Sequence, residues 1–143
     1  MIALLLASLV LAAEPPDDAL IRAVTQRLER DRSLIPDSGL RPTTGPLPLL
    51  QTSDARSFNS AKWSVKSAAA WQETADASGK AVYAVALLFE DVEEAVANVG
   101  VRVEIIVPTN TPGLTLCCCS TTEVFRRVGK TWRFEKRLGT ICS

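Results

Sequence analysis

Residues 81–89 contain apolar side chains on both faces of an extended chain, and this run constrains the fold more than any other segment. Tyr83 and Val85 would lie on one face of a strand, and Ala84 and Ala86 on the other, because successive side chains of a strand alternate. A strand that is apolar on both faces is typical of a sheet interior covered on both sides. The sequence therefore predicts a sheet with this segment in its middle.

One helix is predicted before the strands. Asp17 provides an N-cap, and Leu20, Val24 and Leu28 repeat at helical spacing. The helix should end near Ser33, because a proline follows at position 36 and disfavours helix in the residue before it. Residues 36–60, rich in proline and glycine, are expected to be a long irregular connection, a kind of segment that is often functional.

The remaining segments have β character. Residues 63–74 and 81–89 flank a turn-forming link at 76–79 and are expected to form a hairpin, with a third strand at 99–107. One helix followed by strands predicts an α+β domain over residues 14–143, with the helix packed on a curved antiparallel sheet of about four to six strands.

The first 13 residues, Met1 to Ala13, are almost entirely apolar. A helix of that length cannot span a bilayer, which needs about 20 residues, whereas a secretory signal peptide fits. No basic residue precedes the run, and a buried N-terminal helix or strand is the alternative. The preferred interpretation is a secreted or periplasmic protein with no membrane span after signal removal.

The closing hairpin is the most informative segment. Gly129 and Lys130 suit a two-residue loop, and facing residues would then sum to 259. On that register Phe125 faces Phe134, Arg127 faces Trp132, and Glu123 faces Lys136. An aromatic pair, a cation–π contact and an ion pair would each support it by roughly 0.2–1 kcal/mol.

The same register bears on the four cysteines. Cys117 would face Cys142 at a distance that a disulfide accepts, and a single β-bulge between them would break this pairing. The expectation is a Cys117–Cys142 disulfide, with Cys119–Cys142 as the fallback. An exported chain favours disulfide chemistry over metal binding, and adjacent cysteines such as Cys117 to Cys119 lack the spacing of metal clusters.

Other motifs favour structure over chemistry. The chain has no histidine, which excludes Ser-His and Cys-His triads and every imidazole metal site. The acidic run at 90–94 matches no calcium loop and predicts a solvated turn. Trp63, Trp71 and Trp132 are expected in the core rather than in a ligand pocket.

The 16 basic and 16 acidic side chains give no net charge, which argues against a nucleic-acid binder. The charges are unevenly placed. Residues 73–104 hold seven acids and two bases, a net of −5, and residues 122–143 hold six bases and two acids, a net of +4. These opposed patches are expected to pair across the sheet or to guide self-association.

The stretch Glu123-Val-Phe-Arg-Arg-Val-Gly-Lys-Thr-Trp-Arg-Phe-Glu resembles the terminal hairpin of many NTF2-like proteins, and the order of elements is similar to the NTF2-like and cystatin-like folds. The resemblance implies a cone-shaped sheet with an apolar pocket, used for ligand binding, dimerisation or, in isomerase-like members, acid–base catalysis. No family site motif is matched, and the cystatin inhibitor motif is missing.

Two functions are therefore expected. The first is an exported binding domain without catalytic activity or cofactor, whose partner is a protein or a small apolar ligand, or a second copy in a homodimer. The alternative is a small enzyme of the isomerase or cyclase type, in which a pocket carboxylate such as Glu104 or Glu123 acts as the base. A closed apolar pocket around an unpaired carboxylate would favour the enzyme.

Overall fold

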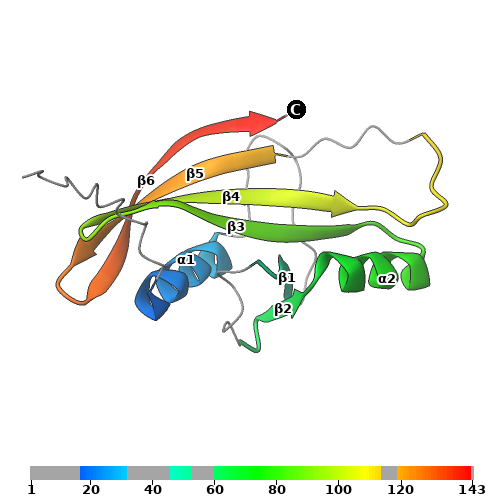
Figure 1. The fold of residues 1–143 in the computed structure, drawn as a ribbon, viewed down its shortest axis with the longest axis horizontal. Helices are drawn as coiled ribbons and strands as arrows, with labels where there is room; N and C mark the ends of the chain where they lie inside the picture. The colour runs from blue at the N-terminus through cyan, green and yellow to red at the C-terminus, as the bar shows by residue number, and fades with distance from the viewer. Residues whose placement is uncertain (1–16, 32–45, 53–59, 114–118, 143) are drawn as a thin grey trace, which may run out of the picture.

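The computed structural model describes residues 17–31, 46–52, 60–113 and 119–142 (Figure 1). The expected signal segment at 1–13 and much of the 36–60 connection lie outside them. The elements in chain order are α1 (Asp18–Arg30), β1 (Leu47–Leu50), β2 (Trp63–Lys66), α2 (Ala68–Ser78), β3 (Val82–Val92), β4 (Val96–Ile106), β5 (Cys119–Val128) and β6 (Thr131–Cys142).

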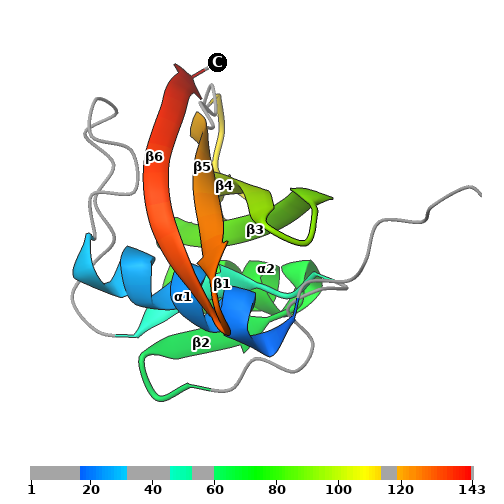
Figure 2. The ribbon, with the colours of Figure 1, turned by 90° about the vertical axis from the view of Figure 1, so that its left-hand side faces the viewer.

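The strands form one sheet in the order β2-β1-β3-β4-β5-β6. The predicted α+β class is confirmed, with α1 packed on the sheet. The sheet is mixed rather than antiparallel throughout: β3 to β6 form an antiparallel meander, while β1 runs parallel to both β2 and β3. In Figure 2, β5 and β6 are long curved strands, and α1 crosses near their lower end.

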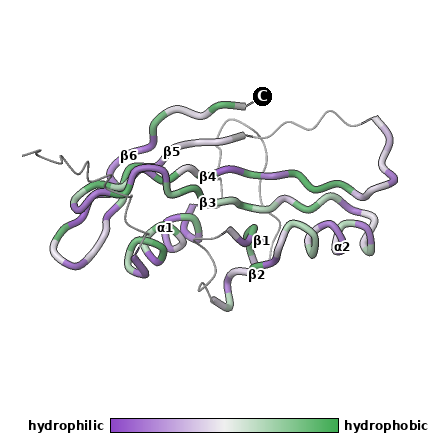
Figure 3. The backbone as a smooth tube through the Cα atoms, viewed as in Figure 1, coloured by the Kyte–Doolittle hydropathy of each residue, from purple (hydrophilic) through white to green (hydrophobic). Residues whose placement is uncertain are grey.

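The strand predicted for the sheet interior is β3, which pairs with β1 and β4. Val85 and Leu87 on one face and Ala84 and Ala86 on the other are all at most 3% exposed. Figure 3 shows hydrophobic residues along β3 and β4 and hydrophilic residues in the turns that join β3 to β4 and β5 to β6.

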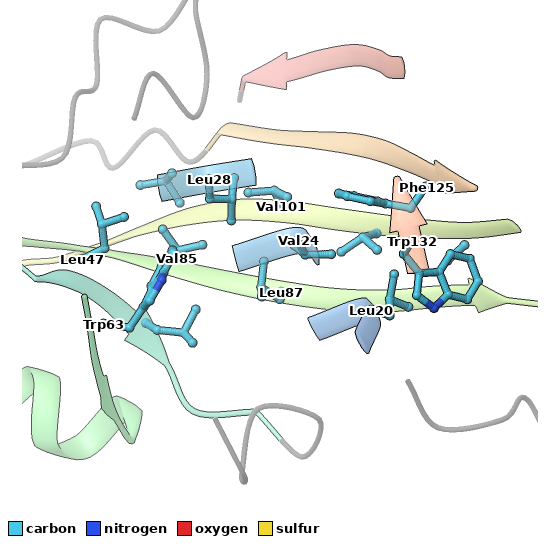
Figure 4. Close-up of a cluster of buried hydrophobic side chains, with 14 residues drawn as sticks. Leu20, Val24, Leu28, Leu47, Trp63, Val85, Leu87, Val101, Phe125 and Trp132 are labelled. Atoms are coloured by element: carbon cyan, nitrogen blue, oxygen red, sulfur yellow. The ribbon is translucent and has the colours of Figure 1, made fainter. Parts of the chain in front are cut away.

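Helix α1 covers one face of the sheet, which we call the core face. Asp17 caps it as predicted, since its Oδ1 accepts a hydrogen bond from the Leu20 amide at 2.6 Å. Leu20, Val24 and Leu28 are at most 1% exposed and pack against the strands (Figure 4). The apolar stripe thus becomes the contact between helix and sheet.

The prediction of a strand over 63–74 is wrong beyond Lys66. Strand β2 ends there, and α2 follows, with the Ser67 side chain as its N-cap and Gly79 as its C-cap at φ 65°. Three alanines open α2, and alanine has the highest helix propensity. Because α2 joins β2 to β3 across β1, the predicted hairpin is replaced by a parallel crossover.

The prediction of an irregular connection over 36–60 is wrong at 47–50, where β1 lies between β2 and β3. Leu47 and Leu49 are fully buried in the core, and this burial holds a strand despite its proline. Pro48 has no N–H to donate, and the pairing of β1 with β3 is limited to Leu49 opposite Val85.

Candidate functional site

The core face of the sheet is filled by side chains and by α1. Phe125 is fully buried, and the three tryptophans are at most 7% exposed, as predicted for core residues. The indole Nε1 of Trp132 donates to Asp17 at 3.1 Å, and that of Trp63 donates to Glu29 at 2.9 Å. The two tryptophans therefore attach both ends of α1 to the sheet.

Glu123, one of the two candidate catalytic carboxylates, lies on this core face with no exposed surface. Its Oε1 accepts hydrogen bonds from Arg137 Nη2 at 2.8 Å and Nε at 3.2 Å, and Arg27 Nη2 lies 3.8 Å from the same oxygen. Its Oε2 has no hydrogen-bond partner within the described part of the chain. The carboxylate is thus buried and ion-paired.

The two arginines form a cluster with their neighbours. Asp31 lies 3.3 Å from Arg27 and 3.5 Å from Arg137, and the Arg27 guanidinium stacks 4.2 Å from the centre of the Phe134 ring. These contacts join the end of α1 to β5 and β6. The arrangement fits an electrostatic contact between helix and sheet.

The second candidate carboxylate, Glu104, lies elsewhere. It is half-buried on β4 opposite Ala84, whereas Glu123 pairs with Val99 on the same strand. Positions 99 and 104 are an odd number of residues apart, so they point to opposite faces of the sheet. The structure does not bring the two carboxylates together.

The opposite face of the sheet, which we call the outer face, carries a hollow of about 230 Å³. Two rows of register partners cross it. The first row is Leu88, Gly100, Thr122 and Leu138, and the second is Ala86, Arg102, Ser120 and Ile141. Because a Cβ added at Gly100 would lie 3.3 Å from the Leu88 Cβ, the absence of a side chain at Gly100 deepens the floor of the hollow.

Two exposed aliphatic side chains line this hollow, Leu88 at 41% and Ile141 at 72% exposure, beside the charged Glu90 and Arg102. Leu138, 42% exposed, lies further along the first row on β6. Ile141 and Leu138 belong to β6, which is the last strand in the sheet order and so has one unpaired edge within the described residues. The hollow and the edge of β6 therefore form one continuous candidate surface.

The register of the β5–β6 hairpin follows the prediction near the turn and departs from it further along the strands. The pairs Phe125–Phe134 and Arg127–Trp132 are formed as predicted, but the register then shifts at two bulges that leave Glu135 and Gly139 without partners. The predicted Glu123–Lys136 pair is wrong, because the first bulge places Arg137 opposite Glu123. Only the aromatic and loop half of the hairpin carries a signal that sequence reasoning can use.

The two bulges also change which cysteine positions are paired in the ladder. Cys119 lies opposite Cys142 in the β5–β6 ladder. Cys117 and Cys118 lie outside the described residues, so the Cys117–Cys142 disulfide stays a prediction. The register agrees with the pair named as the fallback, Cys119 and Cys142, and a disulfide between them also stays a prediction.

The opposed charge patches meet at one end of the sheet. The β3–β4 turn, with exposed Glu93 and Glu94, lies at the same end as the β5–β6 turn with Lys130 (Figure 1). A backbone hydrogen bond of 2.8 Å joins Arg127 N to Ala95 O. The patches are therefore neighbours within one molecule.

Asp76 on α2 is an exposed carboxylate with a structural environment. It accepts hydrogen bonds from the Thr109 amide at 2.7 Å and from the Thr109 hydroxyl at 2.9 Å, and a third from Gln72 at 3.1 Å. The Thr109 amide, then the Thr109 hydroxyl and then Gln72 hold the pKa of this carboxyl below its ordinary value of 3.8. These bonds fasten α2 to the segment after β4.

No described helix is both long and apolar enough to cross a membrane. Over the same residues, no group of three or more His, Cys, Asp or Glu side chains is placed to hold a metal ion. No family model matches the chain, and no curated protein or solved structure matches it. The candidate surface must therefore be interpreted from its own chemistry.

Proposed function

We propose that this protein is an exported binding domain without catalytic activity, which takes an extended acidic segment of a partner protein along β6. Aliphatic side chains of that segment would enter the hollow on the outer face. The carrying observation is that Ile141, which is 72% exposed, both lines the hollow and belongs to β6, a strand with one unpaired edge among the described residues.

The exposed aliphatic side chains in and beside the hollow support a ligand that removes them from water, although Glu90 and Arg102 also line it. Single exposed leucines are ordinary on protein surfaces, but clustered ones mark binding sites. Leu88, Leu138 and Ile141 come from strands far apart in the sequence and lie in two adjacent rows of one face. Burying one such side chain stabilises a complex by roughly 1.5–3 kcal/mol.

The edge of β6 supports an extended peptide rather than a compact ligand. An edge strand presents unpaired N–H and C=O groups, which another strand can satisfy by adding to the sheet. The bulges at Glu135 and Gly139 bend β6, so the partner should pair over a short stretch between or beside them. Side chains that alternate along that segment would reach the outer face at every second residue.

Charge supports an acidic partner. Strand β6 exposes Arg133 and Lys136, and its one acid, Glu135, is paired with Arg126. Two copies joined edge to edge along β6 would bring like charges together, which disfavours that homodimer. An acidic segment would instead be attracted to this edge.

The buried carboxylate does not support the enzyme alternative. Glu123 is ion-paired to Arg137 on the filled core face, and it does not line the hollow. Glu104, on the outer face, is also outside the residues that line the hollow. An acid–base role needs a carboxylate within reach of a bound substrate, and neither candidate has that position. The carboxylate that does line the hollow, Glu90, is exposed to solvent rather than enclosed in an apolar pocket.

Export rests on the apolar segment 1–13 and on the four cysteines. Both suit a secreted or periplasmic protein. Fractionation of cells that express the full chain, with N-terminal sequencing of the product, tests this part separately. Full-length chain retained in the cytosol would contradict it.

Peptide display tests the binding function directly. A library of random extended peptides is selected against the purified chain, and the affinities of enriched peptides are measured by calorimetry. We expect acidic peptides with aliphatic residues at alternate positions. Ile141→Asp should lower the affinity for these peptides at least about tenfold, which is the effect of removing one anchor side chain. Val128→Asp, a matched change at an exposed apolar residue at the end of β5, should not.

Charge reversal gives a second, independent comparison. Lys136→Glu in β6 should weaken binding and Lys130→Glu in the turn should leave it close to unchanged, because charge interactions fall off within a Debye length of about 8 Å at physiological salt. Three outcomes overturn the proposal: no peptide is enriched, both members of a pair behave alike, or Ile141→Asp acts by dissolving a homodimer seen in light scattering.

A further inference from the structure

The two ends of the β5–β6 hairpin bring a pair of cysteines together. Cys119 begins β5 and Cys142 ends β6, and they are register partners. From the turn outward, two bulges each add one residue to β6, so that the cysteine opposite Cys142 is two positions later than an unbroken register would place it. The pairing is thus a product of the bulges.

The ladder sets a backbone distance that suits a covalent bond. Opposite residues of an antiparallel pair have Cα atoms about 4.5 Å or about 5.5 Å apart, depending on the class of pair. A disulfide accepts Cα separations of about 4.4–6.8 Å. Either class of pair therefore allows Cys119 and Cys142 to be bridged without movement of the backbone.

We infer that Cys119 and Cys142 form a disulfide that closes the open end of the hairpin. In its formation the two thiols release two protons and two electrons, and one S–S bond forms. A disulfide oxidant of the glutathione class accepts the electrons and two protons and leaves as two thiols. The inference rests on the register and not on the proposed function.

The bridge would act on the candidate surface. Ser120 and Ile141 are the next pair in the ladder, and both line the hollow. A covalent bond beside them would hold the end of β6 against β5, where Ile141 is 72% exposed. It would therefore fix one wall of the hollow.

Peptide mapping of the oxidised chain provides the first test. Trypsin cleaves after Lys and Arg, so residues 103–126 carry Cys117, Cys118 and Cys119, and residues 138–143 carry Cys142. We expect these two peptides to be joined without reductant and separate with it. Backbone fragmentation between Cys118 and Cys119 should place the link on Cys119. A link on Cys117 or Cys118, or a free Cys142, overturns the inference.

Matched double variants provide the second test. The Cys117→Ser/Cys118→Ser chain keeps only the proposed pair, and the Cys118→Ser/Cys119→Ser chain keeps only Cys117 and Cys142. In glutathione buffers the first should oxidise at the same ratio of oxidised to reduced glutathione as the natural chain. The second should need a ratio at least about tenfold more oxidising, since a bond formed with strain is more easily reduced.

Circular dichroism of both variants under reducing conditions confirms that each is folded before the titration. Equal midpoints, or easier oxidation of the Cys117–Cys142 chain, overturn the inference. The mapping experiment uses the natural chain and decides the question even where a variant does not fold.

Discussion

Glu123 shows how one side chain can be buried without its usual cost. Removing a carboxylate from water is expensive unless it is paired and hydrogen-bonded, and Arg137 provides two hydrogen bonds to Oε1. Arg27 brings a second positive charge from α1. The buried charge therefore makes the helix–sheet contact specific, because a displaced α1 would leave Glu123 with one cation fewer.

Glu123→Gln should lower the free energy of unfolding by about 3 kcal/mol, because the half-buried Arg27 and Arg137 lose their buried anionic partner and keep only Asp31 among the described residues. The matched change Glu135→Gln breaks an exposed pair with Arg126 and should cost less than about 1 kcal/mol. Urea denaturation followed by tryptophan fluorescence measures both. Equal midpoints for the two variants would show that Glu123 contributes no more than a surface charge.

Asp76 makes the stability of the folded chain depend on pH in the acidic range. Its pKa is lowered in the folded state, first by the Thr109 amide. The folded chain therefore binds this proton less readily than the unfolded chain. The stabilisation is fully present above the ordinary pKa of 3.8 and is lost as the pH falls through the lower folded value.

Below pH 3.8, the urea midpoint of Asp76→Asn should change less with pH than that of the natural chain. Near neutral pH, the midpoints of the two chains should depend on pH in the same way. Glu73→Gln, on the same helix, is the control that keeps these bonds. An Asp76→Asn chain with the same acid dependence as the natural protein would rule out this source of stability.

At the scale of elements, a sequence predicts what local pattern decides. The capped apolar stripe of α1 and the doubly apolar β3 are both recognisable, because each carries its periodicity within a dozen residues. Helix α2 is missed even though Ser67 and three alanines signal its start, because Trp63 and Val65 before it favour a strand. Strand β1 is missed because its support comes from burial of Leu47 and Leu49 by distant segments.

The candidate surface is the least predictable part. Its shape depends on the bulges at Glu135 and Gly139 and on a glycine, Gly100, that lies between Leu88 and Thr122 across three strands. Bulges arise from tertiary strain and twist that no short pattern encodes. The sequence predicts the loop and the first four pairs of the β5–β6 hairpin correctly, but it does not predict the register beyond Phe125.

The β5–β6 turn depends on Gly129, which has φ 64°. Gly129→Ala should destabilise the chain by about 1 kcal/mol, since an L side chain is strained in that conformation. Gly139→Ala is the control, because its φ is not positive and a Cβ there meets no atom within 4 Å. Thermal unfolding compares them, and a larger loss at Gly139 would contradict the assignment of the turn.

Helix α1 depends on Asp17 twice, as its N-cap and as the acceptor for the Trp132 indole. Asp17→Ala should lower the free energy of unfolding by about 1.5 kcal/mol. Asp18→Ala, which removes the neighbouring carboxylate, should lower it by only a few tenths of a kcal/mol. In a Trp132→Phe background the cost of Asp17→Ala should fall, because one of the two bonds is already gone. Additive costs in urea denaturation would show that the two residues are not coupled.

At the scale of the whole molecule, stability is expected to decrease across the sheet. Strands β3 and β4 are paired on both sides and cover the core, whereas β6, among the residues that the structure describes, is paired on one side and is mostly exposed from residue 133 onward. Binding surfaces are commonly drawn from the less stable parts of a fold. The edge offered to a partner is thus also the part of the sheet that opens most readily.

Native-state hydrogen exchange measures this gradient. Amides of Val85, Val99 and Val101 should exchange only on global unfolding, and paired amides of residues 136–141 should exchange at least about tenfold faster. Reductant should accelerate exchange in residues 138–142 and leave β3 unchanged, since the inferred bridge restrains only the end of β6. Uniform protection across all six strands would contradict the gradient.

The bulges in β6 have a consequence for how such chains can change length during evolution. Glu135 and Gly139 face no residue of β5, so deleting either one removes no ladder pair and leaves the pairs on each side aligned. Deleting a paired residue would instead turn every later side chain to the other face. Relatives of this chain should therefore gain or lose single residues at positions 135 and 139 while the number of residues between the remaining pairs is conserved.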